Sequence, residues 1–353
     1  MKRPKKEQAS VSDSYWKRNS HGELKYKIQG VGIYDSISKL PCLFFPATYL
    51  LLIILCFNSC SQKTQNPPID PKPPHHSIGI NHIQTIKGNF SQPAGISVDA
   101  DGKIYLVDSG KSRIFVINKE WEIADSIGRF GWKKGEFDQP TDVAIDNRLR
   151  LYIADSGNNR VQRFSLIEQT FGVIVGNKPD DIYAEKNLYE PRGVSVDSKG
   201  DIYIVDTWNH RILKVDPLGR LLLSIGGAGM LSTPQGIAIG KMNNIYVCDS
   251  GNHRICKFDF SGTRKALWGK EGTDKGQFRN PIAIAYDNYG NIYVVDQGNR
   301  RIQVFASNGT YLTEFGRQHL INPFDIAVSR DGHVYVSDTD SADIEVFRII
   351  FDP

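Results

Sequence analysis

The sequence is poor in cysteine, and its few cysteines are badly placed for metal binding or cross-linking. Of the five cysteines, three lie in residues 42–60, and Cys248 and Cys256 flank one predicted hairpin turn. If Asp249 and Arg254 close that turn, the two cysteines point to opposite faces of the sheet, so a disulfide between them has poor geometry. We expect both to be small buried apolar residues. No cysteine and histidine cluster has the spacing of a RING domain, which argues against ubiquitin-ligase activity.

An excess of charge of one sign is also missing from most of the chain. The formal net charge is +4, but residues 1–39 hold nine lysines and arginines against four acidic residues, which leaves residues 40–353 at −1. Nucleic-acid-binding proteins normally carry a basic stripe, so we expect no nucleic-acid partner. The sequence contains no Gly-rich phosphate loop, no Gly-x-Ser-x-Gly elbow and no Cys-x-x-Cys motif.

One long apolar run is present, at Leu43–Phe57. Its fifteen residues carry no charge and are fewer than the roughly 20 that a helical membrane span needs, which favours the core of a signal peptide. The residues Phe57-Asn58-Ser59-Cys60 that end it resemble a bacterial lipobox. That resemblance implies cleavage before Cys60 and lipidation of its side chain.

Two interpretations of the N-terminal region stay open. A lipoprotein signal normally has a short basic start, and residues 1–39 are longer, so either translation starts further downstream or the run is an uncleaved anchor. We expect a basic extension at 1–39, a signal or anchor segment at 40–60, a linker with five prolines at 61–75 and one domain at 76–353. Both interpretations place that domain in the cell envelope, outside the cytoplasm and tethered to a membrane.

Residues 76–353 contain a repeat with a period of 42 to 51 residues. Each unit begins with a proline and a short apolar strand, continues with a tyrosine-containing strand that ends in aspartate, and then has a short loop to an arginine. A third and a fourth strand complete the unit. A period of about 40–50 residues with four short strands is typical of a propeller blade. The repeated pairs are Asp108 and Arg113, Asp155 and Arg160, Asp206 and Arg211, Asp249 and Arg254, and Asp296 and Arg301.

The two ends of the repeat region complement each other. The sixth unit has Asp338 but Asp343 in the arginine position, and no fourth strand follows Val346-Phe347. Ile78–Gly88 has the pattern of an isolated fourth strand. Pairing it with the sixth unit closes the ring and leaves no unpaired edge strand at the seam. We therefore predict an all-β, six-bladed propeller closed by its N-terminal strand. The loop of the sixth unit is then either looser or held by this closing strand.

The repeats resemble the NHL repeat family over residues 76–353. Asp249–Ile255, which reads Asp-Ser-Gly-Asn-His-Arg-Ile, is nearly the family consensus. The resemblance implies a six-bladed propeller, but NHL propellers include lyases, sensor domains, RNA-binding domains and ubiquitin-ligase receptors. A residue pair repeated around a ring is structural far more often than catalytic, because a carboxylate can hold an arginine and fix the loop between them.

Candidate site residues are those that break the repeat on the face formed by the Asp-to-Arg loops and the loops before the starting prolines. The two positions after each starting proline should rim the central channel, and Trp208 replaces the glycine that sister loops carry. Aromatic and basic residues of this kind suit protein, peptide or glycan recognition. The candidates are Arg129, Trp132, Asp142, Arg192, Trp208, Gln235, Arg300 and Asp325.

The sequence favours a monomeric binding or scaffold module over an enzyme. The alternative is a metal-dependent enzyme that resembles peptidylglycine amidating lyase or a lactonase. The lyase resemblance would require histidines after the starting prolines, and none is there. A calcium-dependent lactonase would require several converging carboxylates, to which only Asp142 and Asp325 are candidates. We therefore predict no metal ligand or cofactor, with zinc or calcium as the ions of the alternative.

Overall fold

The computed structural model describes residues 15–18, 24–27, 78–176, 186–227 and 229–351. The predicted signal or anchor segment at 40–60, Cys60 and the linker at 61–75 lie outside the described residues and stay predictions. No helix in the described part of the chain has the length and hydropathy needed to cross a membrane.

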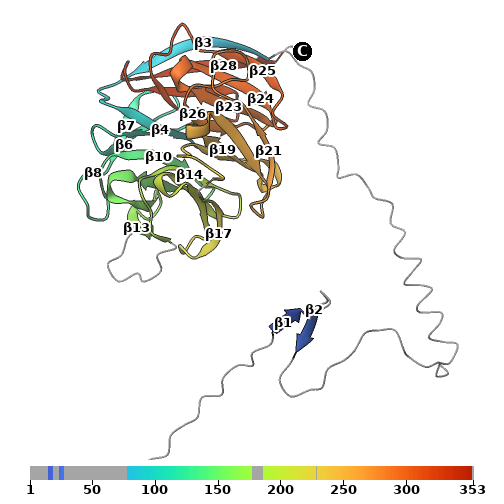
Figure 1. The fold of residues 1–353 in the computed structure, drawn as a ribbon. Helices are drawn as coiled ribbons and strands as arrows, with labels where there is room; N and C mark the ends of the chain where they lie inside the picture. Colours follow the sequence, from blue (N-terminus) through green and yellow to red (C-terminus); the bar gives the residue numbers. More distant parts are fainter. Residues whose placement is uncertain (1–14, 19–23, 28–77, 177–185, 228, 352–353) are drawn as a thin grey trace, which may run out of the picture. The chain divides into compact units, whose positions relative to one another are not determined.

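The chain divides into two compact units, residues 1–70 and residues 71–353. In the first, β1 (Tyr15–Arg18) pairs with β2 (Leu24–Lys27) as an antiparallel hairpin. The second consists of four-stranded antiparallel sheets, with short 3₁₀ turns and no α-helix among its described residues (Figure 1).

Six blades follow one another along the second unit, and we number them one to six. In blades one to five, sequence neighbours pair as a meander, and in blade six the fourth strand comes from the start of the unit. Blades one to three are β4 (Pro93–Val98), β5 (Ile104–Asp108), β6 (Arg113–Ile117) and β7 (Ile123–Ile127); β10 (Pro140–Ile145), β11 (Arg150–Asp155), β12 (Arg160–Ser165) and β13 (Thr170–Gly176); and β14 (Pro191–Val196), β15 (Ile202–Asp206), β16 (Arg211–Val215) and β17 (Leu221–Gly226). Blades four to six are β18 (Ile237–Ile239), β19 (Ile245–Asp249), β20 (Arg254–Phe258) and β21 (Arg264–Trp268); β22 (Pro281–Tyr286), β23 (Asn291–Asp296), β24 (Arg301–Ala306) and β25 (Tyr311–Phe315); and β26 (Pro323–Val328), β27 (His333–Asp338), β28 (Asp343–Phe351) and β3 (Ile78–Lys87). A short parallel pair, β8 (Arg129–Phe130) with β9 (Glu136–Phe137), lies between blades one and two in the chain.

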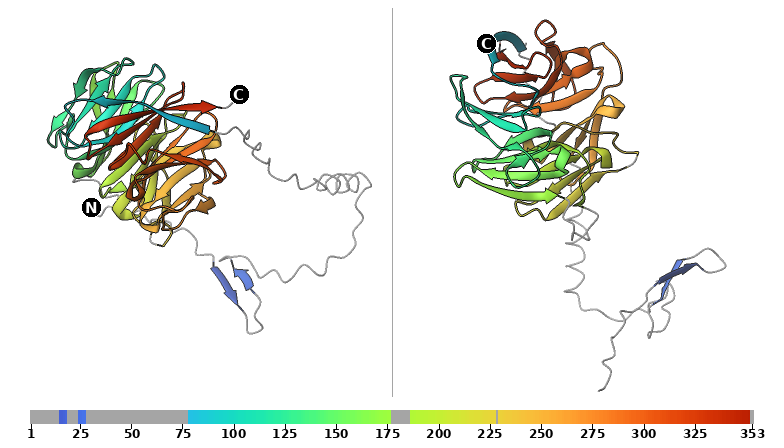
Figure 2. Two further views of the ribbon diagram at one scale, coloured as in Figure 1. Left: turned by 90° about the horizontal axis from the view of Figure 1, so that it is seen from above. Right: turned by 90° about the vertical axis from the view of Figure 1, so that its left-hand side faces the viewer.

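The N-terminal strand closes the ring as predicted. Strand β3 pairs antiparallel with β28, from Asp343 opposite Lys87 to Phe351 opposite Ile78, and the two lie side by side in both views of Figure 2. The first strand of every blade contacts the first strands of both neighbours, including β4 with β26. The six-bladed all-β propeller is therefore confirmed.

The core consists of layers between neighbouring blades, because each sheet is apolar on both faces. The second strand of each blade is almost wholly buried, and its tyrosine is at most 3% exposed in every blade. A buried phenol needs a hydrogen-bond partner, and Tyr293 donates to Asp287 at the end of the preceding strand (3.0 Å). Cys248 lies opposite Ile255, and both Cys248 and Cys256 are buried free thiols.

Four of the five repeated aspartate and arginine pairs form ion pairs. The Nε atom of the arginine lies 2.6–2.7 Å from the aspartate in blades two to five. The Nη2 atom of the same arginine donates to the backbone carbonyl four residues before the starting proline of its blade, as Arg301 does to Gln277 (2.8 Å). Each pair therefore ties its Asp-to-Arg loop to the loop that enters the blade.

Blade one departs from the predicted pairing. Among the described residues, Arg113 forms no ion pair, and its buried Nε atom has no hydrogen-bond partner. Asp108 instead accepts backbone N–H groups, including that of Lys111 (3.0 Å). The Lys111 amine donates to the Asn89 carbonyl, the position that the arginine takes in the other blades. In blade one, Lys111 therefore makes the bond to the entering loop that the arginine makes in blades two to five.

Blade six holds its loop without an arginine. Asp338 accepts the N–H groups of Ile321 (2.7 Å) and Asn322 (3.0 Å). Asp343 lies opposite Lys87 in the antiparallel pairing of β28 with the closing strand β3. The loop is therefore held at its start by Asp338 and at its end by the backbone pairing with the closing strand.

Candidate functional site

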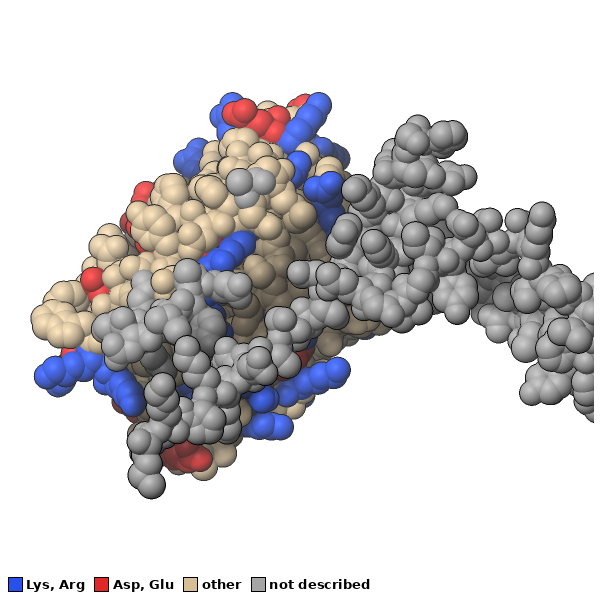
Figure 3. Space-filling view, turned by 60° about the horizontal axis from the view of Figure 1, so that its bottom comes forward, with Lys and Arg blue, Asp and Glu red and all other residues tan. Residues whose placement is uncertain are grey.

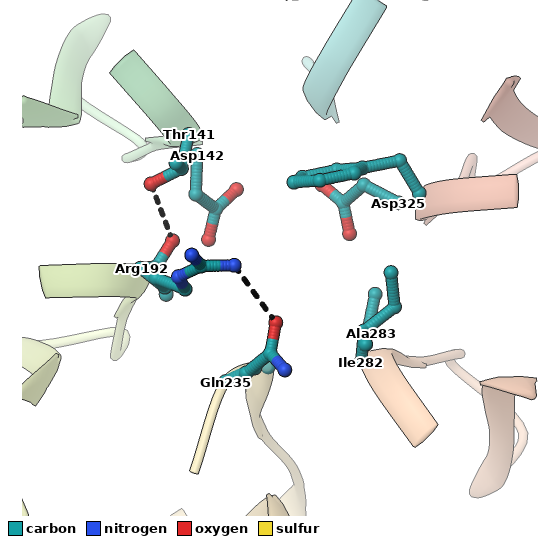
Figure 4. Close-up of a pocket in the computed structure, with 10 residues that line it drawn as sticks. Thr141, Asp142, Arg192, Gln235, Ile282, Ala283 and Asp325 are labelled. Atoms are coloured by element: carbon teal, nitrogen blue, oxygen red, sulfur yellow. Dashed lines mark hydrogen bonds between the residues drawn. The ribbon is translucent and has the colours of Figure 1, made fainter. Parts of the chain in front are cut away.

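A funnel opens on the face of the propeller that carries the Asp-to-Arg loops, which we call the loop face. Its lining comes from the first and second positions after the starting prolines of blades two to six (Figure 4). The lining residues are Thr141, Asp142, Arg192, Gly193, Gln235, Gly236, Ile282, Ala283, Phe324 and Asp325. Blade one contributes none, because Ala94 is 1% exposed and Gly95 packs against blade two.

The small residues at the second position allow the first strands to approach one another closely. A Cβ atom on Gly193 would lie 2.2 Å from the Gln235 carbonyl oxygen, and one on Gly236 would lie 2.6 Å from the Cα atom of Ala283. Both distances are shorter than van der Waals contact, so a larger side chain fits only where the neighbouring backbone leaves room. At the second position of blades two and six the neighbouring backbone leaves this room, and the residues there are Asp142 and Asp325.

The two aspartates face each other across the neck of the funnel (Figure 4). Asp142 accepts the N–H groups of Val143 (2.7 Å) and Val194 (2.8 Å), and Asp325 accepts that of Ile96 (2.8 Å). Val194 and Ile96 belong to the next blade in each case. The carboxylates therefore tie blade two to blade three and blade six to blade one.

The surroundings of these carboxylates disfavour a full charge on both. Burial raises the pKa of Asp142 well above its usual value, and the charge of Asp325 raises it further. Burial also raises the pKa of Asp325 to about 7, although its backbone N–H donors oppose the rise. The pair therefore carries fewer than two negative charges near neutral pH. Both residues also line the channel beneath the funnel, which has a volume of about 200 Å³.

Arg192 lies over the funnel and connects it to a second cavity. Its guanidinium donates to Gln235 (3.4 Å) and lies 3.9 Å from the carboxylate of Glu190. Its backbone carbonyl accepts the hydroxyl of Thr141 (2.9 Å), as Figure 4 shows. Its own side chain is 37% exposed, so its charge faces the solvent above the neck.

The second cavity, which we call the cleft, has a volume of about 370 Å³ and shares Thr141, Arg192 and Phe324 with the funnel. Apart from Gly157, its other lining residues are polar or aromatic. They are Gln92, Ser109, Gln139, Ser156, Gly157, Asn159, Tyr189 and Glu190. Gln92 and Gln139 are exposed, and within the described part of the chain their side-chain amides form no hydrogen bond. They are available to a ligand at the edge of the cleft.

An aromatic pair stands at one side of the cleft. Trp208 donates its Nε1–H to Glu190 (2.8 Å), and its ring centroid lies 6.3 Å from that of Tyr189. Trp208 is 46% exposed and Tyr189 is 54% exposed. Trp208 thus covers a neighbouring loop and also leaves half of its surface open.

Not all predicted candidates gather here. Asp142, Arg192, Gln235 and Asp325 line the funnel, and Trp208 contacts a lining residue of the cleft. Arg129, Trp132 and Arg300 line neither cavity. Arg129 forms an exposed ion pair with Glu136 (2.8 Å).

Sequence reasoning missed two groups of residues. Tyr189 and Glu190, which directly precede β14, were not among the predicted candidates. Their position two and one residues before Pro191 would have identified them, since this loop enters the blade beside the Trp208 loop. The second group, His82, His319 and Glu345, comes from both ends of the ring, and nothing in the local sequence connects its members.

Charges on the propeller are mixed. On the face visible in Figure 3, basic side chains occur in separate groups with acidic side chains and broad uncharged areas between them. Such a distribution differs from the basic stripe of a nucleic-acid-binding surface.

Comparison with known proteins agrees with the repeat. Five segments match the model of the NHL repeat, at residues 90–117, 137–164, 188–221, 231–258 and 278–305. No curated protein matches the chain in sequence.

Solved structures resemble the chain in fold. One is a catalytically inactive variant of virginiamycin B lyase from Staphylococcus aureus with quinupristin, at 17% identity over 77% of this chain and 100% of that chain, with a TM-score of 0.56. Another is a gluconolactonase from Xanthomonas campestris, at 16% identity over 75% and 89% of the two chains, with a TM-score of 0.60. A third is a chain of a nidogen and laminin complex, at 18% identity over 67% and 84%, with a TM-score of 0.55. At these identities the likeness shows the fold alone, and propellers of this fold serve both catalysis and binding.

Proposed function

The chain belongs to the NHL repeat family, and from that premise we propose that it is a binding module that holds a protein, peptide or glycan ligand on its loop face. The proposal includes a membrane tether at residues 40–60, which places the propeller outside the cytoplasm. The aromatic pair Tyr189 and Trp208 beside the cleft is the observation that carries the proposal.

The pair is peculiar to blade three. In the other blades, the loop position of Trp208 is Gly110, Gly157, Gly251, Gly298 or Asp340, and the position of Tyr189 is Ser91, Asp138, Ser232, Arg279 or Ile321. A Cβ atom on Gly157 would lie 2.7 Å from Asp138, so glycine is the residue that the repeat itself favours. Two half-exposed aromatic rings at this point therefore do not follow from the fold.

The geometry of the cleft suits an extended ligand. Tyrosine and tryptophan offer large contact areas at a low cost in side-chain entropy, and the hydrogen bond to Glu190 fixes Trp208 before a ligand arrives. The free amides of Gln92 and Gln139 can bond to peptide groups or sugar hydroxyls. A cavity of this volume is within the range of about 300–1,000 Å³ that is typical of ligand sites.

The enzyme alternative has less support at the same site. Calcium takes six to eight oxygen ligands, but Asp142 and Asp325 already accept backbone N–H groups that join the blades. Within the described residues, no third histidine, cysteine, aspartate or glutamate joins these two around a common point. The neck therefore fits a structural role better than a lactonase centre.

Binding can be tested with peptide and glycan arrays probed with the full-length protein, followed by titration of the strongest ligand. We expect Trp208→Ala to weaken that ligand about 30-fold, because central aromatic anchors contribute about 2 kcal/mol or more. Trp132→Ala is the matched control, since Trp132 is 72% exposed and lies outside the cleft. Equal losses in both variants, or none in Trp208→Ala, would place the ligand elsewhere.

The tether has its own test. We expect cells supplied with a clickable fatty acid to label the wild-type protein and the Cys56→Ala variant but not the Cys60→Ala variant. Labelling that persists without Cys60 would contradict the lipoprotein interpretation.

A further inference from the structure

We propose that His82, His319 and Glu345 form a binding site for a divalent transition metal, with zinc as the best match, at the seam where the ring closes. One donor atom from each residue lies within 4.8 Å of the others. The His82 Nε2 atom lies 2.5 Å from the Glu345 carboxylate, and the rings of His82 and His319 stack with centroids 3.9 Å apart. This cluster lies outside the loop-face site and is independent of the proposed function.

Ring closure brings the three residues together. His82 lies on β3, Glu345 lies 263 positions later on β28, and His319 lies in the loop between β25 and β26. The pairing of β28 with β3 shifts register between Val346 and Phe347, and His82 is the residue opposite Phe347. Phe347 is 2% exposed and contacts both imidazole rings edge-on, so it supports them from the core side.

Glu345 is anomalous among the repeats. It is the second residue after the arginine position, and the five sister blades have a neutral side chain there. These residues are Phe115, Gln162, Leu213, Cys256 and Gln303. Glu345 is 6% exposed, and a buried carboxylate is costly unless a cation or several donors compensate it.

The usual cation of the blade is also missing. Asp343 occupies the arginine position and is 7% exposed, and Asp338 on the neighbouring strand is fully buried. Three buried acidic residues thus lie on two adjacent strands of blade six. A divalent cation held by Glu345 would compensate this charge.

The donor set and its surroundings match zinc. Two imidazoles and one carboxylate are the ligands of a well-known class of tetrahedral zinc sites that keep a fourth position for water. Hard cations such as calcium prefer oxygen donors alone. Thr85 donates to the Glu345 Oε2 atom (3.0 Å), which orients the carboxylate. A cavity of about 290 Å³ adjoins both histidines and leaves room for the water.

The neighbouring arginine does not prevent this use of the site. Arg317 lines the same cavity, but its guanidinium is paired with Glu314 (2.9 Å). Zinc bound here would join the first strand of the propeller to its last one, so binding should stabilise the closed ring. By mass action, a ligand that binds only the folded state raises the stability of the folded protein as the ligand concentration rises.

The test uses full-length protein from which a chelator has removed all metal. Zinc chloride is titrated into this protein by calorimetry, and thermal unfolding is then measured with and without zinc. We expect one zinc per chain and a rise in Tm. The His75→Ala/His76→Ala variant serves as the background, because that tandem could bind zinc by itself. His319→Ala and Glu345→Gln should each weaken zinc binding about 100-fold or more, and His333→Ala should not change it.

Glu345→Gln separates metal binding from folding. Glutamine is the residue that blades two and five carry at this position, so the variant should fold and be at least as stable as the metal-free wild type. Zinc should raise the Tm of the wild type but not that of the variant. Failure of the background protein to bind zinc, or undiminished binding by Glu345→Gln, would overturn the proposal.

Discussion

Deletion of residues 78–88 is expected to open the ring and convert the protein from a soluble species into an aggregate. Strand β3 completes blade six, and Ile86, which is 3% exposed, packs in one core layer with Ile344 and Val346. Ile80 packs against a second layer that contains Phe347. Each such side chain contributes about 1.5–3 kcal/mol when it is buried, so the deletion removes a large part of the stability of a typical domain.

Exposure of β28 is the second consequence of the deletion. This strand reads Asp-Ile-Glu-Val-Phe-Arg-Ile-Ile-Phe and would become a long, apolar edge, which is a template for pairing with other chains. Removal of residues 61–71, an equally long piece of the linker, is the control because it leaves every strand of the ring in place. Light scattering after gel filtration and thermal unfolding report the outcome. A monomeric deletion of 78–88 with an unchanged Tm would show that β3 does not close the ring.

The fold could be predicted because its signals are local and repeated. A tyrosine strand that ends in aspartate recurs six times, and the missing fourth strand of the last unit has its counterpart at Ile78–Gly88. Sequence position alone also located the rim of the channel, since the funnel is lined from the two positions after the starting prolines. Every blade has the same backbone path, so one position in the repeat occupies one place in the ring.

The parts that could not be predicted depend on contacts between different blades or loops. The cleft combines loops from blades one to three with Phe324 of blade six, and the pattern of a single repeat does not show which loops meet. His319 stacks on His82 because the ends of the propeller meet at the seam, and no local pattern around either histidine indicates this contact. The pairing of Asp108 with Arg113 failed because Lys111 competes for the same carbonyl group, which a motif of two residues does not include.

The Arg301→Met substitution should destabilise the propeller by about 3–5 kcal/mol, because it breaks a buried ion pair from one side. Arg301 is 1% exposed and binds Asp296 (2.7 Å) and Glu314 (2.7 Å). It also donates to the carbonyls of Asp274 and Gln277 (2.8 Å each). Methionine has a similar length and fills the space, but it removes the charged donor of a fully buried carboxylate and one donor to each of two carbonyls.

Arg113→Met is the matched control, since the same substitution at the same repeat position meets a different network. Asp108 is held by backbone N–H groups and Arg113 has a buried Nε without a partner, so we expect a change below about 1 kcal/mol. In thermal unfolding, Arg301→Met should lower the Tm by about 10 °C and Arg113→Met by about 2 °C or less. Equal shifts would mean that the arginine stabilises each blade through its aliphatic packing rather than through its ion pair. The predicted contrast instead assigns the lost stability to the carboxylate and carbonyl groups that Arg301 binds and that Arg113 does not bind in its own blade.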